Sequence, residues 1–206
     1  MIAALLAVAL AATPAHTDAV ALARKVQAFY EGTRDLEAHF VQTYTYAAFG
    51  RTQTSSGVLR LKKPGKLRWD YTAPSRKTIV VNGSRLVQYE PDANQAYVDE
   101  HFDATAMSSA VTFLLGKGSL EKEFELATDR EGRLVCVPRH PDARVDRVIL
   151  TVSGTGEVTA TRVVDGSGNV NEITFHDLRR NVGLEDDVFV LDLPPDVHRL
   201  KAPGAG

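Results

Sequence analysis

GVLRLKKPGKLRWDYTAP, residues 57–74, has the pattern of a β-hairpin. Between its two arms lies Lys63-Pro64-Gly65-Lys66, where proline second and glycine third are typical of a tight turn with φ > 0 at the glycine. Successive side chains of a strand point to opposite faces. The arms therefore share one large apolar face, formed by Leu59, Leu61, Leu67, Trp69 and Tyr71. The opposite face is charged, so the apolar face either packs on a core or binds a ligand.

The composition is that of one globular domain. The chain has 206 residues, of which 44% are hydrophobic and 24% are charged. A net charge of −2 gives no bias towards nucleic acid or anionic membranes, so we expect no nucleic-acid partner. The single cysteine, Cys136, excludes an internal disulfide, and its strand-like neighbours predict a buried, inert thiol.

The N-terminal segment predicts export. MIAALLAVALAATPA, residues 1–15, is apolar and small and has no charged side chain. It is shorter than the ~20 residues that cross a bilayer, and it has the apolar core and small-residue exit of a secretory signal peptide, although the usual basic segment is missing. We expect residues 1–15 to be a signal peptide and residues 16–206 to be one domain in the periplasm. The alternative is a buried N-terminal helix.

The rest of the chain alternates short patterned stretches with turn residues, which is typical of an antiparallel β protein. A helix is expected over residues 18–31, with Asp18 as its cap and Gly32 as its stop. Strands are expected over residues 36–47, 52–63, 66–72, 77–81, 85–90, 95–101, 123–128, 133–139, 146–152, 158–164, 169–178 and 188–191. The tail from Pro194 is expected to be partly disordered. Connections this short leave no room for crossover helices, which disfavours a parallel sheet.

One apolar helix is expected among these strands, in DATAMSSAVTFLLGKGS, residues 103–119. Its apolar face, at helical spacing, consists of Met107, Ala110, Val111, Phe113, Leu114 and Leu115. A sheet of about eleven strands must curl or close, because its edges are otherwise exposed. The expected fold class is therefore mainly β, a strongly curved antiparallel sheet with helices against its concave side.

The sequence contains no pattern typical of a catalytic or metal site. It has no G-x-S-x-G and no H-E-x-x-H, and one cysteine cannot form a zinc knuckle. The histidines are scattered, at His16, His39, His101, His140, His176 and His198. We therefore expect no catalytic residue, no metal, no cofactor and no enzymatic activity, although distant residues can converge in a fold.

Three stretches in a fixed order make the sequence similar to the periplasmic outer-membrane lipoprotein carrier family, LolA. The first is DLEAHFVQ, residues 35–42, after the N-terminal helix. The second is GVLRLKKP running into LRW in the opening hairpin, and the third is IVVNG, residues 79–83, followed by the apolar helix near residues 113–115. The resemblance covers about residues 18–193 and is clearest over residues 36–115.

The resemblance implies a half-open antiparallel β-barrel with a helical lid over a hydrophobic cavity. It also implies a carrier that takes triacylated lipoproteins from an inner-membrane lipoprotein-releasing ABC transporter and delivers them to the outer membrane, often to a lipid-anchored acceptor of the same fold. An acceptor needs an N-terminal lipidated cysteine, which is missing here. We therefore expect the carrier, acting as a monomer.

The resemblance also implies roles for particular residues. The acyl-chain cavity would be lined by Leu59, Leu61, Leu67, Trp69 and Tyr71. The lid face over it would be formed by Met107, Val111, Phe113, Leu114 and Leu115. Family members commonly have arginine before the hairpin proline, where it hydrogen-bonds the lid helices. This chain has Lys63 at that position. Lysine lacks the planar fork of arginine, so a lid latch at Lys63 would be weaker or would use different hydrogen bonds.

Several alternatives remain open from the sequence. The apolar hairpin face would be permanent core if nothing binds to it, and Lys63 would be an ordinary turn lysine. The protein would be a sensor, or a carrier of another lipid or amphiphile of the cell envelope, if it resembles regulators that share the curved sheet. A lipid-cleaving enzyme would need a nucleophile and a base that meet in the cavity.

Overall fold

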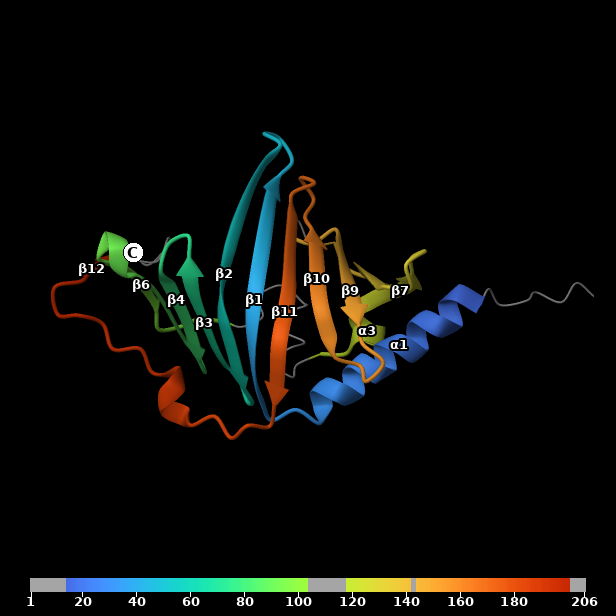
Figure 1. Cartoon of the computed structure of the whole chain (residues 1–206), viewed down its shortest axis with the longest axis horizontal. Coiled ribbons are helices and arrows are strands. Elements are labelled where there is room, and N and C mark those ends of the chain that lie inside the picture. Colours follow the sequence, from blue (N-terminus) through green and yellow to red (C-terminus); the bar gives the residue numbers. More distant parts are fainter. Residues whose placement is uncertain (1–13, 104–117, 142–143, 201–206) are drawn as a thin grey trace, which may run out of the picture.

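The structure, a computed structural model, describes residues 14–103, 118–141 and 144–200 (Figure 1). The helical segments are α1 (Pro14–Glu31), α3 (Leu120–Glu123) and the short 3-10 helices η1 (Pro91–Ala93) and η3 (Asp186–Phe189). The strands are β1 (Asp35–Tyr46), β2 (Arg51–Lys62), β3 (Lys66–Ala73), β4 (Lys77–Asn82), β5 (Arg85–Glu90), β6 (Gln95–Asp99), β7 (Phe124–Thr128), β8 (Leu134–Pro138), β9 (Arg147–Val152), β10 (Val158–Val164), β11 (Val170–Arg180) and β12 (His198–Leu200).

All twelve strands belong to one sheet, in the order β12-β6-β5-β4-β3-β2-β1-β11-β10-β9-β8-β7. Strands β1 to β6 form a first half and β7 to β11 a second half, and the pairing of β1 with β11 joins the two. Neighbours are antiparallel, except that β12 runs parallel to β6. Figure 1 shows a strongly curved sheet whose two edges stay apart. The predicted mainly β, curved and half-open antiparallel fold is confirmed.

One prediction near the C-terminus was wrong. Residues 188–191 do not form a strand, because η3 turns the chain and buries Phe189, which is 1% exposed. The tail from Pro194 contains a strand at His198–Leu200, which pairs with the edge strand β6. Its expected partial disorder stays a prediction. Residues 201–206 lie outside the described part.

Two boundaries near the N-terminus also differ from the predictions. Helix α1 begins at Pro14, four positions before the expected cap at Asp18, and the predicted signal segment lies mostly outside the described residues. The turn of the opening hairpin is one residue longer than expected, because Lys62 and Lys66 form the closing pair. Gly65 has the expected positive φ, at 65°.

Helix α1 packs on the concave side of the second half, against β7 and β8. Its buried side chains recur at helical spacing, at Ala19, Ala23, Val26, Phe29 and Tyr30, and they belong to the same core cluster as the inner residues of the sheet. The turn between β9 and β10 touches the helix at Gly156, where φ is 93° and a Cβ would lie only 2.3 Å from the carbonyl oxygen of Lys25. This glycine lets the helix and the sheet approach closely.

The convex face of the first half carries the charged residues of the opening hairpin. Arg60 Nε lies 2.7 Å from Glu37 Oε2, and Arg60 Nη1 lies 3.0 Å from Asp70 Oδ2. Arg68 Nε lies 2.8 Å from the same Asp70 oxygen. Ion pairs therefore link β1, β2 and β3 on the side opposite the apolar face.

The C-terminal strap, residues 182–200, crosses this convex face (Figure 1). Arg68 Nη1 donates to the carbonyl of Val188 at 3.0 Å. Asp186 accepts from both Lys62 and Lys66, with N–O distances of 2.6 Å. The strap is thus held by a buried ring, at Phe189, and by ion pairs at the ends of β2 and β3.

The Asp186 contacts predict a loss of stability in acid. Hydrogen bonds from Lys62 and Lys66 lower the pKa of the Asp186 carboxyl to about 2. Because the pKa is lower in the folded than in the unfolded state, this stabilisation is complete above pH ~4 and disappears as the pH falls to ~2. We expect the free energy of unfolding, measured with urea, to fall more between pH 5 and pH 2 for the wild type than for Asp186→Asn. Equal pH dependence in the two proteins would contradict this role.

Candidate functional site

The five predicted cavity residues lie on the concave face. Backbone pairing sets Leu59 opposite Trp69 and Leu61 opposite Leu67, and Tyr71 lies two positions further along β3 on the same side. That side carries the core cluster on which α1 packs. Leu59, Leu61 and Leu67 are at most 3% exposed, whereas Trp69 and Tyr71 are half-buried. The pattern of alternation therefore predicted which side chains lie together.

Neighbouring strands extend this surface, which we call the concave apolar face. By the same register it also contains Leu36, Ala38 and Phe40 from β1, Ile79 and Val81 from β4, Leu86 from β5, and Phe175 and Leu178 from β11. Phe40 lies at its centre, with its ring 5.4 Å from that of Trp69 and 5.1 Å from that of Tyr71, both edge to face. Phe40 was not among the predicted site residues, although the alternation within 36–47 places it on this face.

A small cavity lies within the face, where it meets the end of α1. Its volume is about 10 Å³, and it is lined by Tyr30, Leu36, Ala38, Leu59, Leu61, Phe175 and Leu178. This is room for about one water molecule. An acyl chain could enter this small cavity only if its lining side chains moved apart. Leu59, Leu61 and Leu67 belong to the buried core cluster. Their role in lining an acyl-chain cavity stays a prediction.

A row of hydrogen bonds, which we call the polar belt, crosses the concave face. The Tyr71 hydroxyl donates to Gln42 Oε1 at 2.8 Å, and Gln42 Nε2 donates to Asn171 Oδ1 at 2.8 Å. Burial raises the pKa of Tyr71 to about 12. Beside Tyr71, the indole Nε1 of Trp69 is buried and has no hydrogen-bond partner among the described residues. The belt joins β3, β1 and β11, so only the folded sheet brings it together.

Lys63 contacts the end of α1. Its ammonium donates to the carbonyl oxygen of Tyr30, and burial lowers the pKa of Lys63. Arg180 reaches the same turn, with its guanidinium 4.5 Å from the centre of the Phe29 ring. Two cations thus lie at the C-terminal end of a helix, where the helix dipole favours positive charge.

The predicted lid residues lie outside the described part of the chain. They are Met107, Val111, Phe113, Leu114 and Leu115. The lid face and its relation to Lys63 therefore stay predictions.

Cys136 is buried, as predicted, at 1% exposure, and burial raises the pKa of its thiol to about 12.

Among the described residues, no group of three or more His, Cys, Asp or Glu side chains is placed to hold a metal ion. His39 pairs with His176 across β1 and β11, with both side chains exposed. Within residues 14–103, 118–141 and 144–200, no helix is both long and apolar enough to span a membrane.

These features define a class of β proteins in which one curved, half-open sheet encloses an apolar concave face. The sequence profile described as outer membrane lipoprotein carrier protein LolA matches residues 31–192. The chain belongs to this family.

Individual relatives agree with this assignment. An outer-membrane lipoprotein carrier protein of Methylobacillus flagellatus is 33% identical over 173 residues, which cover 82% of this chain and 83% of the relative. One of Pseudomonas aeruginosa is 29% identical over 195 residues, which cover 93% of each chain. The crystal structure of an uncharacterized conserved protein from Thermus thermophilus has the same fold, with a TM-score of 0.53 and 11% identity over 89% of this chain and 99% of that one.

Proposed function

We propose that this protein is a periplasmic carrier that holds lipoproteins by their acyl chains and brings them from the inner to the outer membrane. The main support is a continuous apolar concave face in a chain of the LolA family. The relatives from Methylobacillus flagellatus and Pseudomonas aeruginosa are both named outer-membrane lipoprotein carrier protein. In this proposal the concave apolar face binds acyl chains in addition to stabilising the fold.

The energetics explain why such cargo needs a carrier. Moving one methylene out of water is worth about 0.8 kcal/mol, so a long acyl chain represents on the order of 10 kcal/mol. Three chains on one cargo molecule cannot cross an aqueous compartment uncovered. The concave apolar face would cover them, and the charged convex face keeps the loaded protein in water.

The partners follow from this role. Cargo would be triacylated lipoproteins, loaded by an inner-membrane lipoprotein-releasing ABC transporter and handed to the outer membrane or to an acceptor there. The carrier would act as a monomer in the periplasm, without a cofactor and without catalysis.

Lys63 would act as a latch. Its bond to the Tyr30 carbonyl ties the β2–β3 loop to the end of α1, beside the small cavity lined by Leu61. Acyl chains that enter there would part the loop from the helix and break this bond. Loading and release would then depend on the strength of a single lysine contact.

A release assay tests the proposal. Inner-membrane vesicles that carry newly made triacylated lipoproteins and the matching transporter are mixed with the purified protein and ATP, and the soluble fraction is probed for a complex. We expect ATP-dependent appearance of lipoprotein bound to the protein. Absence of release by a folded protein, from vesicles that support release by another family member, would contradict the proposal.

The same assay tests the latch. Lys63→Met removes the ammonium and keeps most of the side-chain stem, whereas Lys25→Met removes an exposed lysine of α1 as a matched control. A changed rate or extent of release in the first variant alone would support the latch. Identical release in both variants and the wild type would assign Lys63 to the turn only.

A further inference from the structure

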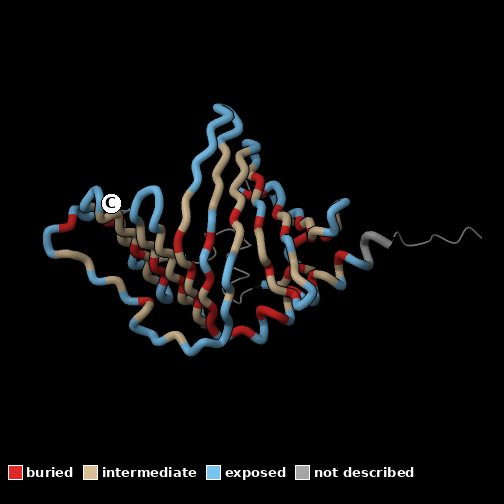
Figure 2. Tube along the Cα trace, in the orientation of Figure 1, coloured by how far each residue is buried: buried red, intermediate tan, exposed pale blue. Residues whose placement is uncertain are grey.

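The concave face changes from apolar to polar along β1, β2, β4 and β5. We call the end next to residues 63–65 the α1 end and the end next to residues 74–76 the far end. Same-face positions from the α1 end to the far end are Leu36, Ala38, Phe40 and Gln42 on β1, Leu61, Leu59, Ser55 and Gln53 on β2, Val81, Ile79 and Lys77 on β4, and Leu86, Gln88 and Glu90 on β5. Figure 2 shows burial fading in the same direction along β1 and β2.

A pocket lies at the far end, beyond the polar belt. Its volume is about 350 Å³, and its lining includes Gln53, Ser55, Tyr71, Lys77, Glu90 and Asp92. Tyr71 belongs both to the belt and to this lining, so the pocket adjoins the concave apolar face. The apolar surface and the polar pocket therefore lie next to each other along the sheet, with Tyr71 between them.

Of the two cations that line this pocket, Arg76 and Lys77, Lys77 is the one without a carboxylate partner among the described residues. The neighbouring Arg76 is paired with Asp92, at 2.6 Å, and Glu90 accepts hydrogen bonds from Gln88 and Gln95. Lys77 Nζ lies 4.4 Å from the centre of the Tyr71 ring, and it forms no ion pair within the described part of the chain. Its ammonium is a half-buried donor that remains available to a ligand.

From this gradient we infer that cargo binds in one orientation, with its acyl chain ends at the α1 end and the carbonyl-rich head of its acylated N-terminus in the pocket beside Lys77. The inference rests on the proposed carrier function. An N-acylated, diacylglyceryl cysteine carries ester and amide carbonyls and no charge, so its head needs hydrogen-bond donors. Lys77, Ser55 and Gln53 supply donors at the far end, and the unpartnered indole N–H of Trp69 is a further donor near the belt.

The length of this stretch of the sheet fits this cargo. Leu61 lies six positions from Ser55 on β2. At about 3.3 Å per residue this spans about 20 Å, which is comparable with an extended long acyl chain. The peptide that follows the acylated residue would leave the carrier at the β3–β4 loop.

The first test measures affinity for a synthetic triacylated peptide and for the apolar probe N-phenyl-1-naphthylamine. Lys77→Met should lower the affinity for the peptide about fivefold to tenfold, because a hydrogen bond from a charged donor is lost, and leave the apolar probe within about twofold. Lys25→Met, at an exposed position of α1, should change neither. Equal peptide affinity of Lys77→Met and wild type would overturn the inference and leave the carrier function intact. Failure of the wild type to bind the peptide would overturn both.

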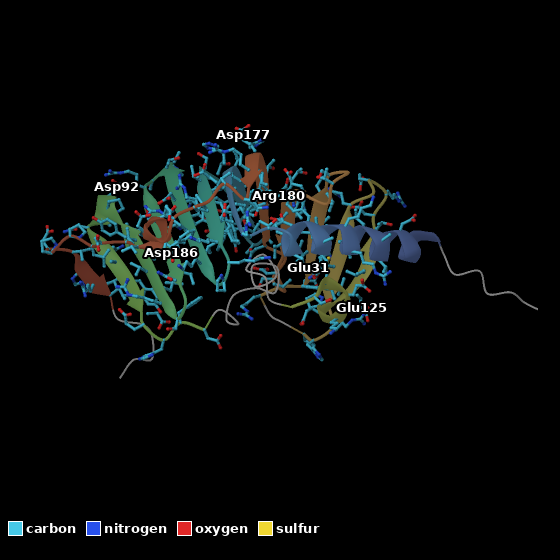
Figure 3. All side chains as sticks on the ribbon, turned by 90° about the horizontal axis from the view of Figure 1, so that it is seen from below. Glu31, Asp92, Glu125, Asp177, Arg180 and Asp186 are labelled. Carbon is cyan, nitrogen blue, oxygen red and sulfur yellow. The ribbon has the colours of Figure 1, made fainter. Side chains whose placement is uncertain are left out.

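The second test measures orientation. A triacylated peptide with an iodoacetyl group at its fourth residue is offered to Ser75→Cys, at the far end, and to Glu31→Cys, at the α1 end. Figure 3 shows that Glu31 lies far along the molecule from Asp92, which lines the pocket. The native Cys136 is buried with a raised pKa, so it gives little background. Preferential crosslinking at position 75 is expected, and equal or preferential crosslinking at position 31 would overturn the orientation.

Discussion

Leu86→Glu should lower the affinity for triacylated peptide at least about 100-fold in a protein that still folds. Leu86 is half-buried on the concave apolar face, and its pairing partners are Val81 and Asp99. In the empty protein the new carboxylate can reach water. With acyl chains bound it would be buried against hydrocarbon, beside the like charge of Asp99, at a cost of several kcal/mol. The measurement is a binding titration, with cooperative unfolding monitored by circular dichroism.

Val41→Glu is the matched control for this prediction. Val41 lies near the middle of β1 but on the opposite side of the sheet, and it is 40% exposed. The substitution puts the same charge in place of an apolar side chain, and the variant should bind the peptide as the wild type does. Similar losses in the two variants would mean that the concave face has no special role. Unfolding of Leu86→Glu alone would instead show that Leu86 is permanent core.

Gly57→Ala should destabilise the fold by roughly 3 kcal/mol or more. A Cβ at Gly57 would lie 1.9 Å from the carbonyl oxygen of Asp70 and 3.0 Å from a ring carbon of Phe40. The first overlap is with backbone, so no change of rotamer relieves it, and β2 would have to separate from β3. The loss should appear as a lower urea midpoint for unfolding.

Gly154→Ala provides the comparison. No atom lies within 4 Å of a Cβ at this exposed position, and its φ is not positive. Its free energy of unfolding should stay within about 0.5 kcal/mol of the wild type. Equal effects of the two alanines would contradict the close approach at Gly57.

The sequence was sufficient to predict most of the fold because its pattern is local. Strand alternation depends only on neighbouring residues, so the expected strands at 85–90 and 158–164 coincide with β5 and β10. The same alternation predicts that Leu59 and Trp69 share one face, and their pairing confirms it. Short connections then required an antiparallel order.

The features that sequence patterns missed depend on contacts between distant residues. The polar belt joins Gln42 to Asn171 across 129 positions, and no local pattern indicates this pair. Alternation predicts a strand over residues 188–191, but the strap forms a 3-10 turn there, which buries Phe189 between the strap and the sheet. The pocket beside Lys77 combines residues from four strands, a loop and η1, so its lining follows only from the folded sheet.

The central claim is that acyl chains bind against the concave apolar face, and the chain's only tryptophan, Trp69, lies on that face. The most direct measurement is quenching of its fluorescence by a triacylated peptide whose acyl chains carry bromine, compared with the same peptide without bromine. Bromine quenches tryptophan only at close range. The account predicts strong, saturable quenching by the brominated peptide alone. Binding of both peptides with equal Trp69 emission would place the acyl chains elsewhere and contradict the account.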